Sequence, residues 1–156
     1  MGVELTVQRT IESGGIPRDE QFRAWAEAAL VGRAGGFSLA IRIVDEAEAR
    51  QFNRDYRGRD YATNVLSFPA ELPHGLPEEL RHSQLGDLLI CAGVVAREAV
   101  EQGKPETDHW AHLVVHGVLH LLGHDHQGEE DAAAMESLEA RILAGLGIPD
   151  PYRAGR

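Results

Sequence analysis

The stretch TDHWAHLVVHGVLHLLGHDH, residues 107–126, decides how the chain folds and where its chemistry lies. Its pattern predicts a helix that begins near Thr107 and ends at Gly123. Five of the 8 histidines of the chain fall within fifteen residues of one another: His112, His116, His120, His124 and His126. The first three recur every four residues, so they form one stripe along the helix.

The geometry of zinc coordination limits which histidines can share an ion. Zinc binds nitrogen at about 2.0–2.1 Å, so two ligating nitrogens lie within roughly 4 Å of each other. His112 and His120 are about 12 Å apart along the helix axis, which is too far for one ion. A glycine at the helix end lets the chain turn back and brings His124 or His126 toward His120. We therefore predict one zinc ion per chain, held by His116, His120 and His126, with the fourth position left for water.

The same residues match a known spacing of metal ligands. HGVLHLLGHDH, residues 116–126, agrees at every metal-binding position with HExxHxxGxxH, the pattern of the metzincin proteases. Gly117 replaces the glutamate that serves those proteases as general base, which weighs against peptide hydrolysis. Metal coordination alone lowers the pKa of water toward ~7, so hydrolysis needs no carboxylate here. Because a glycine within a helix costs about 1 kcal/mol relative to alanine, we expect Gly117 to leave room for substrate beside the metal.

A structural zinc site is the competing interpretation of these histidines. Such a site needs a fourth protein ligand, and His124 or Asp125 could supply it. With His116, His120 and His126 as the ligands of a catalytic zinc, His112 is a packed neighbour, or it supports one of the ligands.

The remaining segments predict a single domain of mixed secondary structure over residues 1–156. Alternating or β-rich segments predict strands over residues 3–7, 38–44, 64–68 and 85–91. Helices are expected from residue 19 onward, from the cap at Asp45 to Arg57, over 94–102 and over 129–143. The expected fold is α+β, with a small mixed sheet of about four strands packed with helices. The zincin-like metal site lies on a helix and the turn after it.

Composition restricts the class of partner and the compartment. The formal net charge of -10 argues against a protein that coats nucleic acid through bulk electrostatics. A local basic site remains open, as does a solvated helix face, because four arginines cluster: Arg50, Arg54, Arg57 and Arg59. Cys91 is the only cysteine, which excludes an internal disulfide and a thiolate zinc cluster. No leader-like or membrane-spanning run is present, so we expect a cytoplasmic protein without membrane contact.

Four stretches carry a family resemblance in addition to the zinc spacing. They are YRGRDYATNVLSFP at 56–69, GDLLIC at 86–91, GKPETDHWAHLVVHG at 103–117 and HLLGHDH at 120–126. In this order they resemble the YbeY endoribonucleases, the bacterial ribosomal RNA maturation factors, over about residues 44–151. The chain departs from the family pattern at His124, where many members carry tyrosine, and at Asn64, where aspartate is also common.

The resemblance implies both a site and an activity. It implies zinc on His116, His120 and His126, and a functionally important Arg57. It also implies hydrolysis of single-stranded RNA in maturation of the 16S rRNA 3′ end and in ribosome quality control, with the ribosome or its proteins as partners. We expect His116 and Arg57 to be catalytic, because a guanidinium can hold a phosphate bidentately and stabilise its growing charge. A metalloprotease-like hydrolase and a non-catalytic ribosome-assembly factor with a structural zinc are the alternatives.

Overall fold

A computed structural model describes residues 3–12, 14–33, 36–70, 75, 84–123 and 129–152. Its strands are β1 (Val3–Arg9), β2 (Phe37–Val44), β3 (Val65–Pro69) and β4 (Gln84–Cys91). Its helices are α1 (Asp19–Ala29), α2 (Glu46–Arg57), α4 (Ala92–Gln102), α5 (Glu106–Leu121) and α6 (Glu129–Gly145). Each strand and helix expected from the sequence is therefore present, with bounds that shift by a few residues. Most of the expected loop over 70–83 lies outside the described residues.

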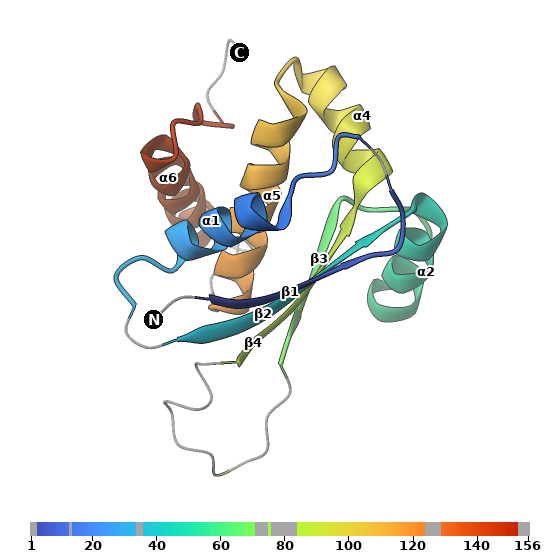
Figure 1. Cartoon of the computed structure of the whole chain (residues 1–156), viewed down its shortest axis with the longest axis horizontal. Helices are drawn as coiled ribbons and strands as arrows, with labels where there is room; N and C mark the ends of the chain where they lie inside the picture. The colour runs from blue at the N-terminus through green and yellow to red at the C-terminus, as the bar shows by residue number, and fades with distance from the viewer. Residues whose placement is uncertain are drawn as a thin grey trace.

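The four strands form one mixed sheet in the order β1-β2-β4-β3 (Figure 1). β1 pairs with β2, and β2 with β4, in parallel, whereas β3 runs antiparallel to β4. β3 therefore forms one edge of the sheet, with Leu66 opposite Leu89. The expected α+β domain with a small mixed sheet is confirmed.

The two faces of the sheet carry different helices. On one face, alternate residues of β2 and β4, among them Ile41 and Leu88, pack in a core that includes α1, α5 and α6. Phe22 of α1 and Trp110 of α5 are both buried there, with ring centroids 5.7 Å apart. On the other face, Leu89 belongs to a smaller core with residues of α2. Figure 1 accordingly shows α2 standing apart from the layer of α1, α5 and α6.

Helix α5 forms where the sequence predicted it. One side of it is buried, including Trp110, Val114 and Val118, and the chain leaves the helix at Gly123 with a φ of 103°. Only glycine adopts such a left-handed backbone without strain, so the helix ends at this glycine as predicted. The chain that follows, over 124–128, lies outside the described residues. None of the described helices has the length and apolar content that a bilayer span requires.

Candidate active site at the edge of the sheet

A cavity of about 670 Å³ lies along β3, the edge strand. It is lined by Tyr56 and Arg57 of α2, residues 63–68, Tyr152, and His112, Leu113, His116 and His120 of α5. Both layers of helices thus contribute side chains to one site, α2 from one face of the sheet and α5 from the other. Three of the predicted site residues, Arg57, His116 and His120, lie in this cavity.

The three histidines share one face of α5, as their spacing predicted, and this face lines the cavity. The ring centroids of His116 and His120 are 4.8 Å apart, and those of His112 and His116 are 6.1 Å apart. His116 and His120 are therefore the closer pair. The third predicted ligand, His126, lies outside the described residues, together with the alternative ligands His124 and Asp125.

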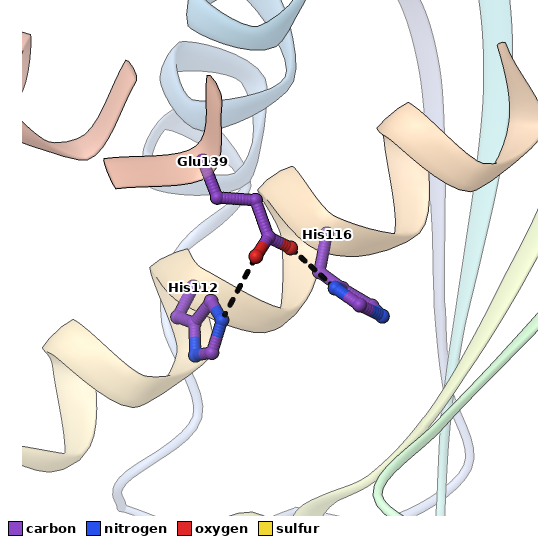
Figure 2. Close-up of side chains that lie close together, drawn as sticks. All are labelled: His112, His116 and Glu139. Atoms are coloured by element: carbon purple, nitrogen blue, oxygen red, sulfur yellow. Dashed lines mark hydrogen bonds and ion pairs between the residues drawn. The ribbon is translucent and has the colours of Figure 1, made fainter. Parts of the chain in front are cut away.

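Glu139 of α6 is a charged residue that the structure buries completely, with 0% of its surface exposed. Its carboxylate accepts a hydrogen bond from Nδ1 of His116 and another from the hydroxyl of Tyr152. Its Oε1 also lies 3.7 Å from Nε2 of His112 (Figure 2). Burial raises the pKa of the Glu139 carboxyl, but the hydrogen bonds from the histidines and Tyr152 outweigh it and hold the pKa at about 2.

The sequence did carry a signal for Glu139. Met135, Glu139 and Leu143 are spaced four apart on α6, and all three are buried. A glutamate between two core positions on one helix face needs polar partners, because an unpaired buried charge is costly. The role of Glu139 was nevertheless not among the predictions from the sequence.

Tyr152 and His112 complete the hydrogen-bonded group around this carboxylate. Since the Tyr152 hydroxyl donates to Glu139, it accepts from Nε2 of His112, at 3.0 Å. Burial lowers the pKa of His112 and outweighs the opposing effect of Glu139. Within the described residues, the buried Nδ1 of His112 has no hydrogen-bond partner. His112 therefore lies where the sequence analysis expected a supporting or packed neighbour.

The donor set fits a metal ion. His112, His116 and Glu139 each offer one ligand atom, and these atoms lie within 4.8 Å of one another. Imidazole nitrogens with carboxylate oxygens suit zinc and several other divalent transition metals. Within the part of the chain that is described, this group could hold a metal ion.

Arg57 differs from its neighbours in the arginine cluster. The hydrogen bond of Asp45 to the backbone of Glu48 begins α2, and Gly58, with a φ of 71°, ends it directly after Arg57. Arg50 binds both carboxylate oxygens of Asp60 at 2.7 and 2.9 Å. Arg54 lies 3.9 Å from the same carboxylate. Arg57 has no ion pair with any described carboxylate, so its charge at the cavity is not neutralised in this way.

Gly117 does not make room for substrate, contrary to the expectation from the sequence. A Cβ added to Gly117 would lie 2.6 Å from Cδ2 of Leu88 on β4, so this side of α5 faces the sheet. The glycine allows α5 to lie close to β4. A larger residue at this position would collide with the core.

Comparisons with known proteins agree with these features. The family model described as "Endoribonuclease YbeY" matches residues 10–147. A protein named "Endoribonuclease YbeY" from Alkalilimnicola ehrlichii is 63% identical, over 97% of this chain and 92% of that protein. The protein of the same name from Halorhodospira halophila is 57% identical, over 97% of both chains.

A solved structure resembles the fold at lower identity. The solution structure of TM1509 from Thermotoga maritima superposes with a TM-score of 0.58 at 22% identity, and covers 93% of this chain and 91% of that one. This likeness concerns the fold alone. The family model and the relatives cover nearly the whole chain, including the cavity-lining segments, and they show that the chain belongs to the YbeY endoribonuclease family.

Proposed function

We propose that this chain is a metal-dependent endoribonuclease that cleaves single-stranded RNA. The observation that carries the proposal is the meeting of Arg57 with His116 and His120 in one cavity. A phosphodiester needs a cation that can contact its oxygens, and a hydrolase needs a group that activates water. Membership of the family and the names of the relatives support the assignment to RNA.

The proposed metal ligands are His116, His120 and His126, and the proposed metal is zinc. The close approach of the His116 and His120 rings supports the pair, because consecutive histidines on one helix face can reach the same ion. Nε2 of His116 lies on the side of the ring away from Glu139 (Figure 2). When bound, the metal supplies Lewis acidity that polarises the phosphodiester and lowers the pKa of water.

Glu139 is proposed to support His116 rather than to bind the metal. It does not line the cavity, and it is hydrogen-bonded to Nδ1 of His116. Two tetrahedral ligands of zinc lie roughly 3.4 Å apart, which is farther than hydrogen-bonded atoms. A carboxylate behind a ligating histidine fixes the tautomer and orientation of its ring.

Arg57 is proposed to hold the phosphate of the scissile bond. Its guanidinium can donate two parallel hydrogen bonds to phosphate oxygens and stabilise the charge that grows on them. The guanidinium of Arg57 lines the cavity and has no described carboxylate partner. A local cation of this kind allows the site to bind RNA although the net charge of the chain is -10. The negative surface elsewhere gives little general affinity for RNA.

The setting follows from the family resemblance. We propose action in maturation of the 16S rRNA 3′ end and in ribosome quality control, in the cytoplasm, by one hydrolase domain that spans residues 1–156. Docking on the ribosome or a ribosomal protein would then supply the specificity that the acidic surface does not.

Two arginines of α2 provide a matched test. We expect Arg57→Ala to lower kcat/KM on single-stranded RNA by about 10²- to 10³-fold, the usual cost of a lost charge-stabilising donor. Arg54→Ala removes the same side chain one turn earlier on α2, and its cleavage should stay within about threefold because exposed ion pairs contribute little. Gel-based cleavage assays at equal zinc content measure both. Wild-type cleavage by Arg57→Ala, or equal losses in the two variants, would contradict the proposed role.

A further inference from the structure

Tyr56 is a large aromatic side chain that the fold leaves open to solvent beside Arg57. Its exposed fraction is 67%, and it lines the same cavity as the three histidines of α5. An exposed aromatic ring is costly to hydrate, so a ring held open at a cavity calls for a ligand with an apolar face.

The packing of Tyr56 holds its ring in place. The ring of Phe52, one turn earlier on α2, stacks on it at an interplanar angle of 12° and a centroid distance of 5.8 Å. Phe68 of β3 meets it edge-on, with centroids 5.3 Å apart. Since both neighbours restrict the ring before any ligand arrives, binding costs little further conformational entropy.

The chemistry beside Tyr56 identifies the ligand class. Arg57 is the next residue in the chain and offers a cation for a phosphate, whereas Tyr56 offers a π face. A nucleotide carries both complementary groups, a flat base and a phosphate. Proteins that bind single strands use this combination of aromatic stacking with backbone contacts.

We propose that Tyr56 is a stacking platform for one nucleobase of the RNA strand, next to the phosphate that Arg57 contacts. This inference rests on the proposed function and deepens it by assigning a base-binding subsite. The platform tolerates any base, because every base presents a π face. It favours single strands, because a base paired inside a duplex cannot be laid on the ring.

Tyr61 provides a matched control for Tyr56. Its exposed fraction is 53%, and it does not line the cavity. Tyr56→Ala, Tyr56→Phe and Tyr61→Ala are made in a His116→Ala background, which keeps the RNA intact if the proposed hydrolysis is correct. The probe is a short fluorescein-labelled single-stranded oligoribonucleotide, and fluorescence anisotropy measures its dissociation constant.

We expect Tyr56→Ala to weaken binding of the oligoribonucleotide about tenfold, since stacking on an aromatic residue contributes on this order. Tyr56→Phe keeps the ring, so it and Tyr61→Ala should bind within about twofold of the parent. A series of probes with one abasic nucleotide at successive positions locates the base. At one position, the abasic probe should bind the parent more weakly than the intact probe does. Tyr56→Ala should bind these two probes equally well.

Two results would overturn the platform: binding by Tyr56→Ala that matches Tyr61→Ala, or loss of binding in Tyr56→Phe as large as in Tyr56→Ala. The first would also be the result if Tyr56 contacted a protein partner instead of RNA. Failure of the proposed hydrolysis is seen separately, as intact RNA with the wild-type protein or as cleavage by His116→Ala. Where the wild-type protein leaves the RNA intact, binding that depends on Tyr56 would still support the platform.

Discussion

Two of the histidine–glutamate contacts of helix α5, those of His109 and His116, have different surroundings. Near its start, Nε2 of His109 lies 2.7 Å from Glu98 of α4, and His109 is 2% exposed. Further along, Nδ1 of His116 donates to Glu139 of α6, and His116 lines the cavity. In the first contact the histidine, His109, is buried. In the second the carboxylate of Glu139 is buried, and the histidine, His116, is partly exposed at the cavity. The same pair of residue types therefore joins two helices in one place and orients a ring toward a cavity in the other.

The partners of the two carboxylates sharpen this difference. Glu98 also accepts a hydrogen bond from the side chain of Asn64, whose own oxygen accepts from the backbone of Val65 at the start of β3. Glu139 is shared by His116, Tyr152 and His112, and all three of these line the cavity. We infer that Glu98 stabilises the junction of α4, α5 and β3. Glu139 instead orients the side chains of the proposed metal site.

The largest effect should separate the two histidines. His116→Gln removes a proposed ligand, so we expect zinc affinity to fall at least about 10³-fold, more than the 10- to 100-fold cost of losing a supporting contact. His109→Gln should keep zinc affinity and lose about 1 kcal/mol of unfolding free energy, because the half-buried carboxylate of Glu98 loses the hydrogen bond from the imidazole. Competition with a chromophoric chelator and urea unfolding measure the two quantities. Equal zinc affinities in the two variants would remove the distinction between the contacts.

The second effect concerns the carboxylate behind His116. Glu139→Gln keeps the shape of the side chain but loses the charge that orients the His116 ring, so zinc affinity should fall about 10- to 100-fold. Glu136→Gln makes the same change at an exposed position one turn earlier on α6 and should leave affinity within about twofold. If Glu139 were itself a ligand, Glu139→Gln would lower the number of protein ligands, and X-ray absorption of the zinc-loaded variant would detect it. An unchanged number of protein ligands together with weaker zinc binding would indicate that Glu139 orients His116 and does not bind the metal.

Features that depend on residues close in the sequence could be predicted, whereas features that depend on packing between separate elements could not. The helix of α5 and its histidine stripe depend on local periodicity, and both were predicted. The side of α5 on which Gly117 lies depends on how the helix is rotated against β4, and that prediction was wrong. The spacing of Glu139 between Met135 and Leu143 indicates a buried glutamate, but its partners depend on how α6 packs beside α5, which the spacing does not encode. The cavity itself joins α2 and α5 across the edge of the sheet, so only the family resemblance associated Arg57 with the histidines beforehand.

The smallest effect concerns the pH dependence of stability at the enclosed contact. Burial raises the pKa of Glu98, but the hydrogen bonds from His109 and Asn64 outweigh it, so its pKa lies below the ordinary value. A lowered folded-state pKa stabilises the protein above the unfolded pKa of about 4.3, and this stabilisation is lost as the pH falls through the folded value. Glu98→Gln lacks this titration. The urea midpoint should therefore fall less from pH 7 to pH 3 in Glu98→Gln than in the wild type. The zinc affinity of this variant at pH 7 should stay within about twofold of the wild type. An equal fall in both proteins would mean that folding does not lower the pKa of Glu98, and that its contacts add no pH-dependent stability.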